Sequence, residues 1–183
     1  MTGRLYGLEV HYNNNKPLYC FSAEHAGVGV QLYNVDGSLN LMVYVKVAGE
    51  RTQYQLKMIL PGDKLSFRYL YCDDTMASNI DELGAQSRAG KPSALLPGFK
   101  IGLDAKLKSG KTVRVSHPED GGFRFILGNI PLDHARTQFM AGNRVEEWHW
   151  QFPDLYPNEA ITLEVVETNW NDPPPSVERR EKS

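Results

Sequence analysis

The feature that most constrains the fold of this chain is a pattern of short strand-like segments that occurs twice. Lys16 and Lys111, for example, are 95 residues apart (111 − 16 = 95) and occupy corresponding turns of the two copies. The matching segments are 8–16 with 103–111, 24–30 with 119–125, 34–35 with 129–130, 48–51 with 141–144, 54–58 with 148–152 and 63–67 with 159–163. The offset drifts only near turn-like residues, where insertions are tolerated. We interpret the pattern as an internal duplication.

Both copies have the pattern of β-strands. Apolar and polar residues alternate in 54–58 and again in 148–152, and 41–47 is rich in β-branched and aromatic residues. Clusters of Gly, Asn, Asp and Pro separate these segments, as turns require. We therefore predict an all-β fold of two tandem, similar antiparallel units, each resembling a sandwich or barrel, with little helix. The only helical candidates are 79–86 and 132–140.

The repeat also predicts the domain boundaries. We expect a first β unit at 1–73, an acidic and flexible linker at 74–96, a second unit at 97–168 and a disordered tail at 169–183. A unit of about 70 residues buries only a marginal core, so we expect the two to pack face to face. One continuous sandwich and two independently moving units are the alternatives. We also expect the strand at 41–47 to lie at a sheet edge, where it could pair with a second copy in a homodimer.

Charge and hydropathy exclude several classes of partner. The 20 Lys and Arg residues and the 22 Asp and Glu residues nearly cancel, so we expect binding to neither nucleic acid nor a membrane. The first residues lack the apolar region of a signal peptide, and no apolar run approaches the roughly 18 residues of a membrane helix. We therefore expect a cytoplasmic protein. Cys20 and Cys72 are too few for a disulfide scaffold, and we expect two reduced thiols, with a single bridge as the alternative.

The sequence contains no familiar catalytic or cofactor motif. Its five histidines lack the spacing of a zinc site, and it has neither a nucleophile elbow nor a phosphate-binding loop. We therefore predict a protein that is not an enzyme and that has no cofactor, no metal and no catalytic residues. If the chain were an enzyme, His25, Asp120 and His149 would be the best candidates for catalysis.

A few aromatic and acidic residues could form a binding surface. Two tryptophans share one face of a strand, which favours packing in the core, although an exposed stacking platform is the alternative. Tyrosines are common at interfaces, and paired aspartates could meet a basic partner. The candidate surface residues are Trp148, His149, Trp150, Tyr12, Asp73 and Asp74.

These observations favour a protein that acts through a surface. We predict a non-enzymatic β protein that binds a protein partner, as a cytoplasmic immunity protein, inhibitor or adaptor does, because such a role needs only complementary shape and charge. The alternative is a module that binds a sugar or small metabolite in a cleft between the two units.

Overall fold

The computed structural model describes residues 5–22, 27–35, 37–47, 49–72, 76–130 and 134–181. The regular secondary structure of the described residues is almost entirely β-strand, which confirms the predicted all-β class. Its one helical element, the 3₁₀-helix η1 (Ile80–Gln86), lies within the helical candidate at 79–86. The other helical candidate, 132–140, is wrong: the described part of it contains most of strand β10 (Arg136–Gly142), where Thr137 and Phe139 are buried in alternation with exposed residues.

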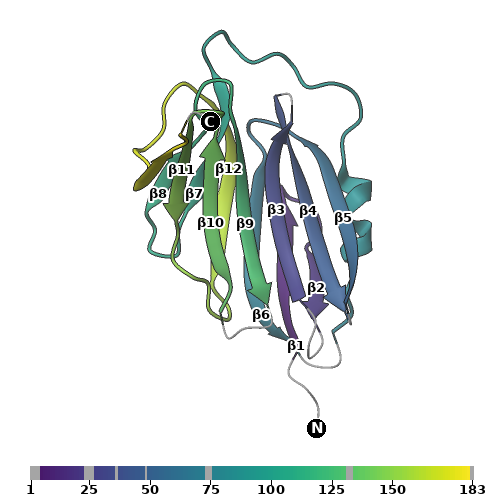
Figure 1. The fold of residues 1–183 in the computed structure, drawn as a ribbon. Helices are drawn as coiled ribbons and strands as arrows, with labels where there is room; N and C mark the ends of the chain where they lie inside the picture. The colour runs from purple at the N-terminus through teal and green to yellow at the C-terminus, as the bar shows by residue number, and fades with distance from the viewer. Residues whose placement is uncertain are drawn as a thin grey trace.

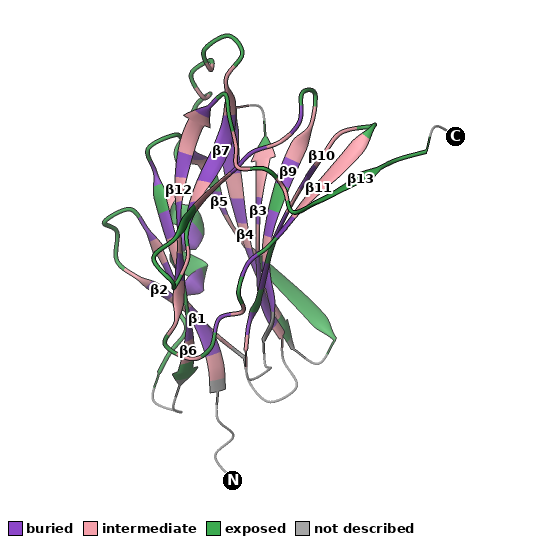
Figure 2. Ribbon diagram, turned by 90° about the vertical axis from the view of Figure 1, so that its left-hand side faces the viewer, coloured by how far each residue is buried: buried purple, intermediate pink, exposed green. Residues whose placement is uncertain are grey.

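The strands form two antiparallel sheets that pack face to face (Figures 1 and 2). Sheet A contains, in spatial order, β2 (Leu18–Ser22), β1 (Leu5–Tyr12), β6 (Lys64–Cys72), β12 (Ala160–Thr168), β7 (Lys100–Lys106) and β8 (Thr112–Val115). Sheet B contains β13 (Ser176–Arg179), β11 (Glu146–Gln151), β10, β9 (Gly122–Ile130), β3 (Gly27–Val35), β4 (Ser38–Val47) and β5 (Glu50–Ile59).

Each half of the chain contributes to both sheets. The first half supplies β2-β1-β6 and β3-β4-β5, and the second supplies β12-β7-β8 and β9-β10-β11. The halves are therefore joined edge to edge, through the β6–β12 and β3–β9 pairs, and not face to face as we expected. This arrangement is the continuous sandwich that was the alternative. Counted outward from those two pairs, β6, β1 and β2 correspond to β12, β7 and β8, and β3, β4 and β5 correspond to β9, β10 and β11. Among the described strands, only β13 has no counterpart.

The registers of these two pairs match the offset of the sequence repeat. Ser66 lies opposite Thr162 in β6–β12, and these residues are 96 apart (162 − 66 = 96). Gln31 lies opposite Ile126 in β3–β9, and these residues are 95 apart (126 − 31 = 95). At both junctions, a residue is thus paired with the residue that the alignment of the two halves in our sequence analysis assigns to it.

A single apolar core fills the space between the sheets. Inward-facing side chains of both halves belong to one buried cluster, and the rings of Phe67 and Phe125 stack across it with centroids 6.0 Å apart. Burial of this apolar surface is the main stabilising contribution. Cys20 lies in this core with a free thiol, and the side chain of Cys72 is outside the described residues.

Two segments differ from expectation in their position. The strand at 41–47 is not at an edge, because β4 pairs with β3 on one side and β5 on the other. Part of the tail expected to be disordered forms β13, which pairs with β11. Among the described residues, none of the helical structure is long and apolar enough to span a membrane.

Candidate functional site

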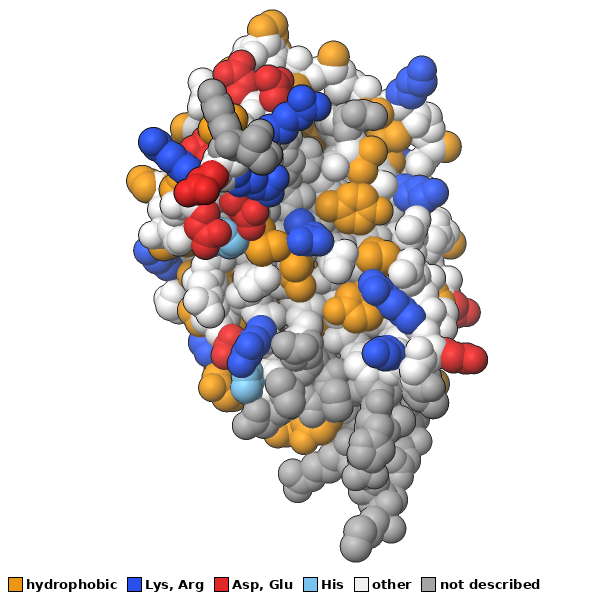
Figure 3. Space-filling model, viewed as in Figure 1, with side chains coloured by type: hydrophobic (Ala, Val, Ile, Leu, Met, Phe, Trp, Pro, Cys, Tyr) orange, Lys and Arg blue, Asp and Glu red, His pale blue; other side chains and the backbone are white. Residues whose placement is uncertain are grey.

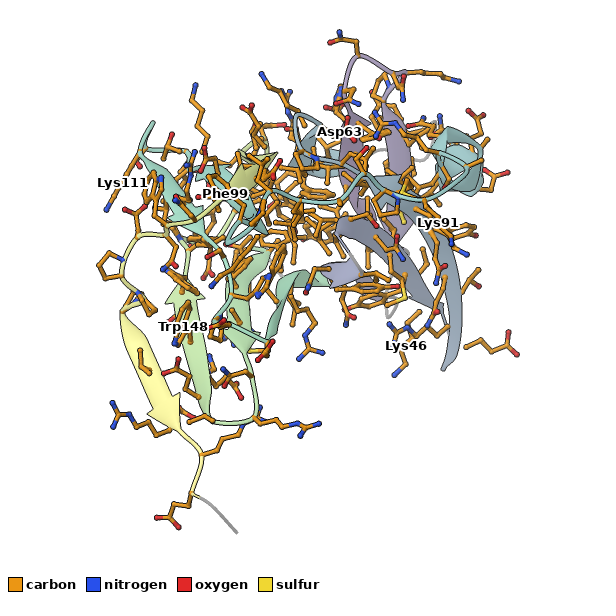
Figure 4. All side chains as sticks on the ribbon, turned by 90° about the horizontal axis from the view of Figure 1, so that it is seen from above. Lys46, Asp63, Lys91, Phe99, Lys111 and Trp148 are labelled. Atoms are coloured by element: carbon orange, nitrogen blue, oxygen red, sulfur yellow. The ribbon has the colours of Figure 1, made fainter. Side chains whose placement is uncertain are left out.

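The predicted surface residues that the structure describes do not share one exposed surface. Trp150 is 2% exposed, and Trp148 is partly buried beside it with the ring centroids 6.0 Å apart, so these tryptophans pack in the core. His149 is on the outer side of β11, with its Nε2 atom 3.2 Å from Glu147 Oε1. Figure 4 places Trp148 in the sheet B layer, on the opposite side of the sandwich from Asp63. Asp73, Asp74 and His25 lie outside the described residues.

Tyr12 belongs to a polar cluster around the buried Asp63. The Asp63 carboxylate accepts hydrogen bonds from the Tyr12 hydroxyl (2.9 Å), Asn13 Nδ2 (3.0 Å), the Leu60 amide (2.8 Å) and both terminal nitrogens of Arg88. Burial alone would raise the pKa of Asp63, but these donors outweigh it and hold the pKa well below its ordinary value. Burial, followed by the hydrogen bond to Asp63, raises the pKa of Tyr12 to about 12. Through Tyr12 and Arg88, the cluster joins β1 to the segment between β6 and β7, which we call the connector, and we interpret the cluster as structural.

The outer face of sheet A carries charges that are paired with one another. Arg114 donates two hydrogen bonds of 2.6 Å to the Asp104 carboxylate, from Nε and from Nη2. Weaker contacts join Lys64 to Glu164 (3.9 Å) and Arg68 to Glu9 (3.8 Å). Three of the basic residues on this face are therefore neutralised by carboxylates, whereas Lys106 of β7 is exposed and forms no ion pair with another described residue.

The outer face of sheet B has a different charge pattern. Strands β3, β4, β5, β9 and β10 contain five basic residues and one acidic residue, Glu50, although the whole chain has a net charge of −2. The basic residues are Lys46, Arg51, Lys57, Arg124 and Arg136. None of them forms an ion pair with another described residue.

Apolar side chains occupy the centre of the same face. They come from β3, β4, β9 and β10 and are partly exposed: Tyr33, Met42, Tyr44, Ile126 and Met140. Figure 3 shows hydrophobic side chains across the middle of this face with Lys and Arg among and beside them. Acidic side chains gather at the upper left, where β11 and β13 lie. We call these five apolar and five basic side chains the basic face.

One aromatic ring of the basic face lies flat on the sheet. The Tyr44 ring covers Gly29, where any side chain would collide with it, and its hydroxyl extends toward Gly128. The Arg51 guanidinium carbon lies 4.2 Å from the centroid of the Tyr44 ring, within the range of a cation–π interaction. Glycines on two neighbouring strands thus make room for a tyrosine and an arginine that form a flat platform.

Our sequence analysis missed the basic face, although the sequence contains a signal for it. Successive residues of a strand lie on opposite faces of the sheet. In the predicted strand at 41–47, one of these two faces carries Met42, Tyr44 and Lys46. Summing charge over the outward positions of each strand would have shown the excess of Lys and Arg. Which strands lie side by side, however, depends on long-range pairing.

Comparison with known proteins found no matching family model, and no match among curated proteins or solved structures. The described residues also include no group of three or more His, Cys, Asp or Glu side chains placed to hold a metal ion.

Proposed function

We propose that this protein is a non-enzymatic binding protein whose basic face docks an acidic surface of a protein partner. The observation that carries the proposal is the set of five basic residues, unpaired within the described chain, around a partly exposed centre of tyrosine, methionine and isoleucine. The outer face of sheet A differs, because three of its basic residues, Lys64, Arg68 and Arg114, are paired with carboxylates.

The composition of the basic face suits a protein interface. Tyr, Met and Arg are enriched in interface cores, and such patches combine an apolar centre with a polar rim. Arginines on the rim attract an acidic partner and accelerate association. This chemistry fits an immunity protein, inhibitor or adaptor, which acts by covering a partner and needs no reaction of its own, and we propose a cytoplasmic location for it.

The basic face depends on both halves of the chain. Tyr33, Tyr44 and Arg51 come from the first half, whereas Arg124 and Met140 come from the second. Tyr33 lies opposite Arg124 across β3–β9, and Arg124 lies opposite Met140 across β9–β10. The strand order and the registers support our interpretation that the halves arose by duplication, and one copy alone would present only part of this face.

Affinity capture from native lysate tests the proposal when it compares three tagged baits. The first is the wild type, the second carries Arg124→Glu and Arg136→Glu on the basic face, and the third carries Lys106→Glu and Lys111→Glu. Lys106 lies in β7 of sheet A and Lys111 in the turn that follows, and both are exposed, so the third bait makes the same change in net charge elsewhere.

We expect the wild type and the sheet A variant to retain the same acidic protein, and the basic-face variant to lose it. Equal retention by all three folded baits would contradict the proposed face. An empty capture with folded wild-type bait would contradict protein binding and favour the alternative, a module for a sugar or small metabolite.

A further inference from the structure

Strand β5 forms one edge of sheet B, and part of that edge corresponds to the place that β13 covers on β11. The pairing of each strand with its inner neighbour shows which residues correspond. Val43 of β4 pairs with Tyr54 of β5, and Phe139 of β10 pairs with Trp150 of β11. Phe139 is 96 positions after Val43, and Trp150 is 96 positions after Tyr54. On β11, β13 pairs with residues 146–149. Subtracting 96 gives residues 50–53 at the start of β5.

Residues 50–53 of β5 are uncovered in the described structure. All four are exposed, and no described strand pairs with β5 on its outer side. The later part of the same edge is covered by the connector: the Lys57 amide donates to Ser87 Oγ (2.9 Å) and Lys57 O accepts from the Arg88 amide (3.4 Å). The free main-chain groups are therefore concentrated in the first half of β5, where an added strand could bind.

Strand β13 has one unfavourable pair on its own neighbour. All four of its residues are exposed, and although Arg179 lies opposite Glu146, Glu178 lies directly opposite Glu147 of β11. Like charges at such positions are unfavourable, although Arg180 Nη2, 3.0 Å from Glu147 Oε2, offsets part of this repulsion.

The same four residues would match β5 better. In the register that β13 uses on β11, Glu178 would lie opposite Arg51 and Arg179 opposite Glu50. Val177 would lie opposite Thr52, a pair of β-branched residues that favours strand pairing. Both charged pairs would thus join opposite signs.

We propose that the exposed edge at residues 50–53 binds the C-terminal strand, Ser176–Arg179, of a second copy of this chain. The strand would add antiparallel, in the register it has on its own β11. The chain is anchored up to Asp172, whose amide donates to Arg114 O (2.9 Å), so the three prolines that follow are the segment that would redirect it. Exchange of a short element between copies is a low-cost route to association.

The contact must be between copies because the two edges are far apart. Strands β13 and β5 are at opposite ends of the seven-stranded sheet B. Six steps at about 4.8 Å per strand separate them by roughly 29 Å. Three residues span at most about 11 Å when fully extended. A chain cannot place its own β13 on its own β5.

Peptide binding tests the edge directly. The probe is a labelled synthetic peptide of residues 172–181, titrated against the full-length wild type, Arg51→Glu, Arg51→Lys and Lys57→Glu. Lys57→Glu is the matched control, since it makes the same charge change on the same strand where the connector covers the edge. We expect weak binding that Arg51→Glu reduces about fivefold or more, while Arg51→Lys and Lys57→Glu bind like the wild type.

Exchanging the charges provides a rescue. A peptide carrying Glu178→Arg should bind Arg51→Glu better than it binds the wild type. No binding of the native peptide to the wild type, or equal binding by all four proteins, would overturn the proposed edge.

Sedimentation of the full-length protein tests whether a second copy of the chain supplies the strand that binds residues 50–53. We expect association that increases with concentration and that Arg51→Glu weakens relative to Lys57→Glu. A chain that stays monomeric up to millimolar concentration would overturn the second copy as the occupant. These readouts need no other protein, so they are independent of the capture experiment on the basic face.

Discussion

Gly62 and Asn158 make equivalent hydrogen bonds in the two halves of the sandwich. They are 96 residues apart (158 − 62 = 96), and both have positive φ angles, 96° and 69°. The Gly62 amide donates to Val165 O and the Asn158 amide donates to Tyr69 O, each at 2.8 Å. Val165 and Tyr69 are themselves 96 apart. Each turn is thus bound to a strand of the opposite half, and we expect the halves to unfold together.

Substitution of Gly62 should show how strictly this turn needs its backbone conformation. The left-handed region costs an ordinary side chain about 1–2 kcal/mol, whereas Asn tolerates it. Gly62→Val should therefore lower the free energy of unfolding in urea by about 1–2 kcal/mol, and Gly62→Asn by only a few tenths. Equal losses for the two variants would contradict the equivalence with Asn158.

The counterpart of Asp63 in the second half is Glu159, and the two carboxylates differ in burial. Asp63 has an 8% exposed side chain and several donors, whereas Glu159 is 34% exposed and 2.8 Å from Lys108 Nζ. Asp63→Ala should cost about 2–3 kcal/mol of unfolding free energy, since it leaves buried donors unpaired. Glu159→Ala should cost about 1 kcal/mol or less. Urea denaturation of both variants at pH 7 measures the difference, and a larger loss for Glu159→Ala would contradict the assignment.

Asp63 should also make stability depend on pH in acid. Its pKa is lowered in the folded protein, so the unfolded chain binds the proton more readily. The carboxylate therefore contributes its full stabilisation above about pH 5, and this contribution is lost as the pH falls through the folded pKa. Urea denaturation between pH 2 and pH 7 should show a smaller acid loss for Asp63→Asn than for the wild type. Parallel curves would mean that Asp63 is not the group responsible.

Cys20 should be unreactive in the native protein. Burial raises the pKa of its thiol to about 12, so almost none of it is the nucleophilic thiolate at pH 8. We expect alkylation by iodoacetamide, followed by peptide mapping, to modify Cys20 only after the protein unfolds in urea. Rapid labelling in native buffer would show that this part of the core opens.

The sequence predicted the strands well because alternation and turn residues act locally. It could not fix their register: our alignment matched Tyr54 with Trp148, whereas the ladders place Tyr54 in the position of Trp150. A shift of two residues preserves the inward face, so hydrophobic pattern alone does not detect it. The β-branched run at 41–47 likewise shows that a strand forms there, without showing that it lies between two others.

The candidate binding face was harder to predict for the same reason. Arg51 and Arg124 are distant in the sequence, and they share a face only because β3 and β9 pair. The aromatic residues that we selected, Trp150 and Tyr12, are prominent in the sequence, yet both are buried. Large aromatic side chains stabilise a core so strongly that their presence alone says little about a surface.

The most direct measurement is the affinity of the captured partner for the wild type and for the Arg124→Glu/Arg136→Glu variant, titrated at low and at physiological salt. If the basic face docks an acidic surface, the double reversal weakens binding at least tenfold, and the affinity of the wild type falls as salt increases. The Lys106→Glu/Lys111→Glu variant should bind like the wild type. Equal affinity of all three proteins, with no dependence on salt, would contradict the proposed face.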